Sequence, residues 1–353
     1  MDTKLKIGMP AGSLADPNRG GNLINLLTNS GFNVSGYAQG GPTKFTSVNF
    51  LFGWDGRPQE FGSQLEINEI DVAIAGDDWI RERVLEMKLE YGTEVHLERV
   101  LALNRGGVKL VGIVDSAQFD TVEDFLKNLC SQKKLITVVS EMPYMALDWL
   151  RTKLNSIGLL DKFQSFSVQK YKTPSKIESG IVIYETWGKT EAKVRNGGAD
   201  IGLEITQSGS AIKNYGLKII DTVINSQTSI WINPNVKKDA EKLDLLNMFL
   251  LNLYGSINAE NKMMVMFNVF NENVHEIDRY LREKNLFADE PTVSVGKNFT
   301  VYNVQIDAGN INEPLAKVRY ELAKRGATSI NTLPVQSSIP SIKVLTNSEL
   351  SKE

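Results

Sequence analysis

The sequence predicts an α/β protein that ends in a smaller, ferredoxin-like unit. Up to about residue 258, short apolar runs alternate with segments of helical periodicity, a pattern typical of a largely parallel sheet covered by helices. From about residue 260 the predicted order is β-α-β-β-α-β, the order of a ferredoxin-like unit. The 353 residues, 42% hydrophobic and 23% charged, have the composition of an ordinary globular chain of about two or three domains.

The first predicted elements are two strands, each followed by a helix. Residues 5–10 alternate apolar side chains with small or polar ones and stop at Pro10. Residues 22–32 then have the periodicity of a helix that ends near a glycine. The continuous apolar run 72–76 predicts a strand buried on both faces, and we expect Asp77 to cap the helix that follows.

The same alternation continues in the middle of the chain. A strand is predicted at 135–140, and Pro143 fits the first turn of the next helix. A strand at 181–185, a short helix at 189–198 and a strand at 199–205 repeat the pattern. In such a sheet, ligands bind beyond the carboxyl ends of the strands.

The last part of the chain supplies the ferredoxin-like unit. A long amphipathic helix at 237–256 leads into it, and the tail is polar. The predicted strands and helices are 262–270 (strand), 271–287 (helix), 291–295 and 299–306 (strands), 311–326 (helix) and 328–335 (strand).

Charge and hydropathy argue against two classes of partner. The net charge is −3 and lysine and arginine form no long run, which excludes a nucleic-acid-binding face. The longest apolar stretch, 245–255, is too short to cross a bilayer, so we expect no membrane partner. The first residues lack the apolar core of a signal peptide, and we expect a cytoplasmic protein.

The chain has few side chains for nucleophilic or zinc chemistry. Cys130 is the single cysteine, and we expect it to be a small buried filler. His96 and His275 are the two histidines, too few for a triad or a multi-histidine metal site. Any chemistry must therefore rest on carboxylates, backbone amides and a borrowed cation.

The junction after strand 199–205 predicts an anion site. Asp200 and Glu204 share one face of that strand, with Glu204 nearer its carboxyl end. The small residues 208–211 then offer unobstructed amides at the start of a short helix. A carboxylate beside a phosphate favours a bridging Mg²⁺, although a plain turn with a serine cap explains the same residues.

This junction, "EITQSGSAI" at 204–212, resembles the phosphoribosyl-pyrophosphate loop of ATP phosphoribosyltransferase, the first enzyme of histidine biosynthesis. The resemblance covers nearly the whole chain in order. It includes "LKIGMPAGSL" at 5–14, "RPQEFGSQLEINEIDVAIAGDDWI" at 57–80, "VSEMPYMALDWL" at 139–150, "GKTEAKVRNGGADIG" at 188–202, and the segments "KMMVMFNVF", "PTVS" and "AKRGATSINTLPV".

The resemblance implies a bilobal catalytic part of the type II periplasmic-binding fold with a ferredoxin-like regulatory domain. Lobe I would comprise 1–106 and 216–258, lobe II 107–215, the regulatory domain 259–340 and a polar tail 341–353. The family's long form condenses N1 of ATP with 5-phosphoribosyl pyrophosphate and releases pyrophosphate with Mg²⁺. Histidine would act as an allosteric inhibitor, and dimers would assemble into hexamers.

The resemblance also implies roles for individual residues. Glu204 would hold the ribose hydroxyls or the metal, Arg57 the pyrophosphate, and Glu191 would orient the site. Thr292, Ala327 and Thr328 match positions that hold histidine, although turn chemistry explains them equally well. The substrate-binding positions carried over are Gln207, Ser208, Gly209, Ser210 and Ala211 in the loop, and Gly12, Ser13, Gly76 and Asp77 in the facing lobe.

Some positions depart from the family pattern. Ala11 and Ser13 stand where the family has lysine and arginine, and each lost cation costs about 1.5–3 kcal/mol of a buried contact. Gln59, Met142 and Ala211 also differ from the usual basic, tyrosine and threonine residues.

These departures leave two alternatives open: a non-catalytic anion or nucleotide sensor, and transfer to a different acceptor. The segment 36–56, longer than usual, is interpreted as a loop that could supply new contacts. Trp54 within it either stacks on a base or packs.

Overall fold

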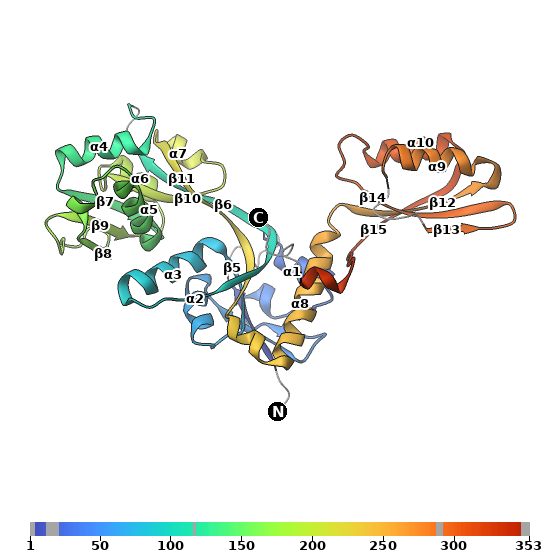
Figure 1. Ribbon diagram of the computed structural model, residues 1–353, viewed down its shortest axis with the longest axis horizontal. Helices are drawn as coiled ribbons and strands as arrows, with labels where there is room; N and C mark the ends of the chain where they lie inside the picture. Colours follow the sequence, from blue (N-terminus) through green and yellow to red (C-terminus); the bar gives the residue numbers. More distant parts are fainter. Residues whose placement is uncertain (1–3, 12–20, 116–117, 287–291, 347–353) are drawn as a thin grey trace. The chain divides into compact units, whose positions relative to one another are not determined.

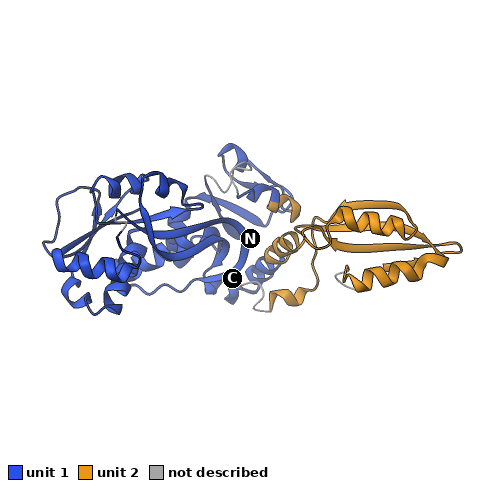
Figure 2. Cartoon of the chain, turned by 90° about the horizontal axis from the view of Figure 1, so that it is seen from above, with its two compact units in different colours: residues 1–25, 32–248, 347–353 blue, residues 26–31, 249–346 orange. Residues whose placement is uncertain are grey.

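The computed structural model describes residues 4–11, 21–115, 118–286 and 292–346. The chain forms two compact units, coloured separately in Figure 2. The larger comprises 1–25, 32–248 and 347–353, and the smaller comprises 26–31 and 249–346.

The larger unit is built on one mixed sheet with the order β2-β3-β4-β1-β5-β11-β6-β10-β7-β9-β8 in its described part (Figure 1). Its strands are β1 (Leu5–Pro10), β2 (Val34–Ser35), β3 (Lys44–Phe45), β4 (Leu51–Gly56), β5 (Val72–Gly76), β6 (Glu98–Val114), β7 (Leu135–Ser140), β8 (Phe166–Lys170), β9 (Gly180–Glu185), β10 (Ile201–Thr206) and β11 (Lys218–Ile232). Its helices include α2 (Pro58–Glu66), α3 (Asp77–Tyr91), α4 (Val122–Gln132), α5 (Pro143–Ser156), α6 (Thr190–Arg195) and α7 (Ser210–Asn214). Helix α1 (Leu23–Asn29) and helix α8 (Ala240–Asn258) each begin in the larger unit and end in the smaller.

The sheet has two wings, which are the two lobes. In lobe I, β1 pairs in parallel with β4 and β5; in lobe II, β7 pairs in parallel with β10 and β9, and β8 with β9. The long strands β6 and β11 run between the wings, antiparallel to each other and to the strands beside them. The predicted bilobal α/β architecture of the type II periplasmic-binding kind is therefore confirmed, with a sheet that is more mixed than the alternation suggested.

The segment 36–56 is not only a loop, as the sequence suggested. Residues Leu51–Gly56 form β4, which lies beside β1 inside the sheet. Trp54 is half-buried and packs against the lobe I core around Phe61 and Leu65. Of the two interpretations of Trp54, packing is what the structure shows.

The smaller unit carries the predicted β-α-β-β-α-β order. Its sheet has the order β13-β14-β12-β15 with antiparallel pairs, and Figure 1 shows both helices on one face. Buried side chains of β12, such as Phe267, pack with Ile277 and Val318 of the two helices. The elements are β12 (Lys262–Phe270), α9 (Val274–Glu283), β13 (Thr292–Val295), β14 (Phe299–Asp307), α10 (Leu315–Lys324) and β15 (Ala327–Pro334).

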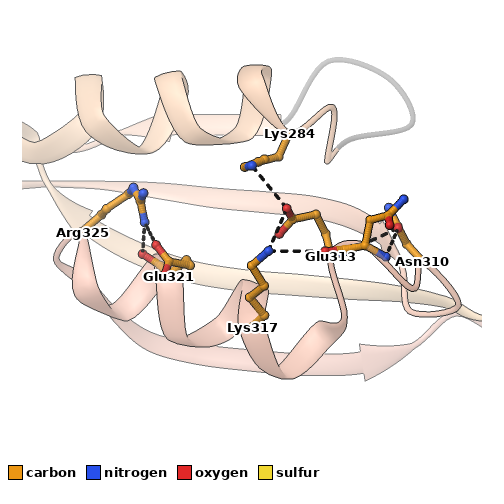
Figure 3. A network of polar contacts seen from close by, with 7 residues as sticks. Lys284, Asn310, Glu313, Lys317, Glu321 and Arg325 are labelled. Carbon is orange, nitrogen blue, oxygen red and sulfur yellow. Dashed lines mark hydrogen bonds and ion pairs between the residues drawn. The ribbon is translucent and has the colours of Figure 1, made fainter.

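A charged network joins α9 to α10 on the helical side of this unit (Figure 3). Glu313, 7% exposed, pairs with Lys284 at 3.4 Å and with Lys317 at 3.1 Å. Arg325 pairs with Glu321 one helical turn away and covers the ring of Tyr280 at 4.4 Å. These contacts fix the two helices to each other over the sheet.

Part of the predicted polar tail is folded. Residues Ile342–Leu345 form a 3₁₀ turn in which Val344 is buried, and the Ser341 hydroxyl accepts a hydrogen bond from the Lys343 amide. The remaining tail residues, 347–353, lie outside the described residues. No helix in the described ranges is long and apolar enough to cross a membrane.

Candidate functional site

The two lobes face each other across two adjoining cavities of about 460 and 350 Å³. Arg57, Gln59 and Trp79 line both cavities and therefore connect them. The first cavity is also lined by Ala11, Pro58, Gly76, Asp78, Gly106, Val108, Ile205, Ser226 and Thr228. The second is also lined by Glu60, Glu82, Arg83, Glu86, Glu141, Pro143, Tyr144, Val168, Glu185 and Trp187.

The predicted anion loop follows the carboxyl end of β10, as expected. Gly209 precedes α7 with φ of 73°, a left-handed backbone that glycine adopts without strain. Its amide donates to the Thr206 hydroxyl at 2.9 Å, and the Ser210 amide donates to the Ser208 hydroxyl at 3.3 Å. Two of the amides expected to hold a phosphate thus donate to hydroxyls of the loop itself. An incoming anion must displace these hydroxyls from the amides.

Other groups of the loop are open to a ligand. Ser208, Ser210 and Ala211 are exposed, as is Gln207. Within the described residues the amides of Ser208 and Ala211 have no hydrogen-bond acceptor. The Ser208 and Ser210 hydroxyls lie 2.8 Å apart, so the loop can present hydroxyls and amides to one anion.

Glu204 lies at the end of β10, just before this loop. The pKa of Glu204 is raised to about 7, mainly by burial and also by the neighbouring acids Glu191 and Glu141. The Thr190 hydroxyl and the Ile205 amide partly offset that rise. Oε2 of Glu204 and Oγ1 of Thr190 are both buried without a hydrogen bond of ordinary geometry to a described residue.

The surroundings of Glu204 suit a divalent cation that takes most of its ligands from water and substrate. The described residues contain no group of three or more carboxylate, histidine or cysteine side chains arranged to hold a metal. Mg²⁺ commonly binds one or two carboxylates and takes its other ligands from water and substrate phosphates. The free oxygen of Glu204 suits an ion that arrives with its substrate, and does not form a resident site by itself.

The facing lobe contributes groups that follow β1 and β4. Arg57 is exposed, precedes α2 and lines both cavities, where an anionic ligand can reach it. Oε1 of Gln59 is buried there without a partner in the described chain. Ala11 lines the first cavity, whereas the predicted positions Gly12 and Ser13 lie outside the described residues.

The two aspartates after β5 point to different places. Helix α3 begins at Asp77 without a side-chain cap, so the predicted cap is wrong. Asp77 accepts hydrogen bonds from Arg99 at 3.2 Å and Trp231 at 3.0 Å, and lines a separate cavity of about 540 Å³. Asp78, with Gly76, lines the cleft instead, and burial raises the pKa of Asp78.

The start of α5 also differs from the family pattern in an informative way. Met142, where the family has tyrosine, is fully buried in the lobe II core. Its amide donates to the Ser140 hydroxyl at 2.9 Å, and that hydroxyl donates to the Leu203 carbonyl at 3.0 Å. The position therefore serves packing, and the junction is tied to β10.

The three predicted regulatory positions lie apart in one chain. Thr292 begins β13, and Ala327 and Thr328 begin β15; these are the two opposite edges of the sheet. Strands lie about 4.8 Å apart, so about 14 Å separates the edges. Thr292 and Thr328 are exposed, whereas Ala327 is buried in the core.

Sequence reasoning missed several residues that line the cleft. Asp78 and Trp79 follow the predicted strand end directly, and Ser226 and Thr228 come from β11, which was not predicted. The apolar run "SIWI" at 229–232 was the available signal for that strand.

Comparison with known proteins shows the family of this chain. The family model described as ATP phosphoribosyltransferase matches residues 57–253, more than half of the chain. An ATP phosphoribosyltransferase of Nitratidesulfovibrio vulgaris (strain DP4) is 26% identical over 330 residues, covering 90% of this chain and 93% of that protein. One from Desulfosudis oleivorans is 24% identical, covering 96% of this chain and 100% of that protein.

Among solved structures, a chain of the ATP phosphoribosyl transferase (HisG:HisZ) complex from Thermotoga maritima is 15% identical with a TM-score of 0.47. The match covers 70% of this chain and 96% of that chain. Because the family model spans more than half of its residues, this chain belongs to the ATP phosphoribosyltransferase family and is a pentosyltransferase.

Proposed function

We propose that the chain transfers the phosphoribosyl group of 5-phosphoribosyl pyrophosphate to N1 of ATP, the first step of histidine biosynthesis. The observation that carries this proposal is the junction 204–212, of which Ile205 lines the first cavity. There a carboxylate with a buried oxygen that makes no hydrogen bond of ordinary geometry precedes a glycine-centred turn with open amides. Membership in the family supplies the reaction class.

The reaction is a displacement that needs positioning more than a protein nucleophile. N1 of ATP forms a bond to C1 of the ribose while the bond to pyrophosphate breaks, and positive charge develops on the ring. The ionised carboxylate of Glu204 stabilises that charge or holds the ribose hydroxyls. The loop amides and the Ser208 and Ser210 hydroxyls hold the 5-phosphate, which fixes C1 in the cleft.

Charge at the second cavity has to be neutralised for two polyanionic substrates to enter. The cavity is lined by two arginines, Arg57 and Arg83, and by the glutamates Glu60, Glu82, Glu86, Glu141 and Glu185. We propose that Mg²⁺ bound to the pyrophosphate supplies part of this compensation and uses Glu204 as a ligand. Arg57, at the junction of both cavities, is the proposed contact for the leaving pyrophosphate.

Histidine inhibition and assembly into dimers and hexamers are further parts of the proposal. They are supported by the ferredoxin-like unit and by the matches at Thr292, Ala327 and Thr328. Because these positions lie on opposite sheet edges, a site that uses all three has to combine two copies of the chain.

The direct test is pyrophosphate release from the full chain with ATP, 5-phosphoribosyl pyrophosphate and Mg²⁺, with and without histidine. Release that requires all three reactants supports the proposal. Release only with another purine or base in place of ATP supports transfer to a different acceptor.

A second candidate is a non-catalytic sensor of the same ligands. The observation that favours it is the presence of alanine at two positions where the family has lysine and threonine. These are Ala11, which lines the cleft, and Ala211 in the anion loop. Binding of 5-phosphoribosyl pyrophosphate without release from any acceptor would identify the sensor.

A further inference from the structure

Glu82 forms a buried contact between the lobes at the first turn of α5. It lies on α3 of lobe I, which packs against α5 of lobe II (Figure 1). Its two carboxyl oxygens accept hydrogen bonds from the Tyr144 amide at 2.9 Å and the Met145 amide at 2.7 Å. Glu82 is 6% exposed, so this contact is shielded from water.

This contact completes the hydrogen bonding of the α5 N-terminus. Pro143, the first helical residue, has no N–H, and the Ala146 amide donates to the Met142 carbonyl at 3.0 Å. Met142 occupies the capping position and provides no side-chain cap. Among the described residues, lobe II provides no acceptor for the amides of Tyr144 and Met145, and Glu82 of lobe I provides it.

The contact continues toward the candidate site through lobe II. The Met142 amide donates to the Ser140 hydroxyl at 2.9 Å, and Ser140, fully buried, donates to the Leu203 carbonyl at 3.0 Å. Leu203 directly precedes Glu204 on β10. Two sets of hydrogen bonds, joined by the backbone from Met142 to Tyr144, therefore connect lobe I to the strand end that carries Glu204.

We propose that Glu82 is a positioning residue: by capping α5 from the opposite lobe, it holds the end of β10 and Glu204 in register with lobe I across the cleft. This inference rests on the proposed function for its kinetic consequences. Its structural content, the link from α3 to β10, does not depend on which acceptor the enzyme uses.

The charged groups around Glu82 make this link sensitive to pH. Arg83 and Glu86 face it from its own helix, and on the α5 side the Tyr144 hydroxyl donates to Glu90 at 3.3 Å. Glu141 and Glu185 line the same cavity. Burial raises the pKa of Glu82 to about 8 from 4.5, and the two amides offset only part of that rise.

The sign of the pH effect follows from that direction. A carboxyl group whose pKa is raised by burial stabilises the buried contact at low pH. Its contribution is complete below about pH 4.5 and is lost as the pH rises to about 8. Protection of the α5 first turn should therefore fall between about pH 4.5 and 8, and a glutamine at this position should remove that dependence.

The experiment compares Glu82→Ala and Glu82→Gln with the wild type, using Asp148→Asn as a matched control. Asp148 pairs with Arg81 across the same two helices at 3.8 Å, but both side chains are exposed, so its loss is expected to have little effect. For each protein, kcat and KM in pyrophosphate release and the hydrogen-exchange protection of residues 140–146 and 203–206 are measured.

For Glu82→Ala we expect kcat to fall about 10- to 100-fold, with KM for 5-phosphoribosyl pyrophosphate changed less than about threefold. Protection should be lost at 140–146 and also at 203–206. Glu82→Gln, which keeps the side-chain volume and one acceptor, should recover part of both. If Glu82→Ala does not fold, Glu82→Gln carries the comparison, with a smaller fall in kcat and lower protection at both segments than in the wild type.

Two results would overturn the proposal. One is a variant that unfolds at lower temperature but keeps wild-type kcat and wild-type protection at 203–206. The other is an equal effect from Asp148→Asn. If the wild type itself releases no pyrophosphate, the proposed reaction fails, and hydrogen exchange alone decides whether Glu82 links α3 to β10.

Discussion

The hydroxyls of Ser208 and Ser210 lie 2.8 Å apart across the turn that starts α7, and the Ser208 hydroxyl also accepts from the Ser210 amide. This arrangement keeps an oxygen where we propose that a phosphate oxygen binds. Before a ligand arrives, hydroxyls of the loop accept hydrogen bonds from two of its amides. An anion would replace these hydroxyls as the acceptor.

Ser208→Glu should abolish binding of 5-phosphoribosyl pyrophosphate, because it places a fixed negative charge at the proposed phosphate site. Ser208→Ala, which removes only the hydroxyl, is the control and should weaken binding by no more than about tenfold. Isothermal titration in the presence of Mg²⁺ measures both. An unchanged dissociation constant for Ser208→Glu would show that the phosphate binds elsewhere.

The pKa of Glu204, raised to about 7, predicts the pH dependence of catalysis. If the ionised carboxylate is the active form, kcat/KM should rise with pH and level off above about 7. Glu191→Gln removes one of the charges that raise this pKa, so its profile should shift toward lower pH.

The measurement is kcat/KM for pyrophosphate release between pH 5 and 9 in both proteins. A profile that has the same midpoint with and without Glu191 would contradict the assignment. So would a profile that falls, instead of rising, across this range.

Much of the fold could be predicted because its elements have strong local patterns. Strand β5 is a continuous apolar run, α5 begins at a proline, and the ferredoxin-like unit alternates clearly. Strands β6 and β11 were missed because their pairing is broken by bulges, including the left-handed residues Asn104 and Gly106, which interrupt any regular period.

The site was predictable only where sequence neighbours form it. Loop 207–211 is one such segment. Which of two successive aspartates faces the cleft depends on where α3 begins, and the prediction chose Asp77 where the structure places Asp78. The contact from Glu82 to Tyr144 joins residues 62 positions apart, so no local pattern contains it.

The different environments of Asp77 and Asp78 give a second pair of variants. Asp77→Asn should lower the free energy of unfolding by about 1–3 kcal/mol, because it weakens a largely buried pair with Arg99. Ligand affinity should change little. Asp78→Asn should instead alter ligand binding, because Asp78 lines the cleft.

Urea unfolding and ligand titration of both variants check this contrast. Asp115→Asn, which breaks an exposed pair with Arg195, serves as the control for loss of a charge and should be close to neutral in both assays. A loss of ligand affinity in Asp77→Asn without loss of stability would support the substrate-binding role that the sequence predicts for that residue.

Ending the chain after Asn258, the last residue of α8, should remove inhibition by histidine while pyrophosphate release continues. The reason is that the deleted part contains all three proposed regulatory positions, whereas the cleft belongs to the larger unit. Circular dichroism confirms that the shortened chain is folded. A shortened enzyme that is still inhibited would place the regulatory site in the larger unit.

The opposite edges of the small sheet predict a complementation experiment. Thr292 and Thr328 lie on different edge strands, so one chain cannot bring them together, and a shared histidine site must take one from each of two copies. Thr292→Arg and Thr328→Arg should each abolish inhibition, because an arginine fills its half of every site. In a mixed assembly of the two variants, some sites combine the two intact halves, and part of the inhibition should return.

The measurement is inhibition of pyrophosphate release after the variants are dissociated and reassembled together, with each variant reassembled alone as the control. Recovery only in the mixture supports a site between copies; no recovery, with assembly confirmed by size, would mean that Thr292 and Thr328 do not share one site.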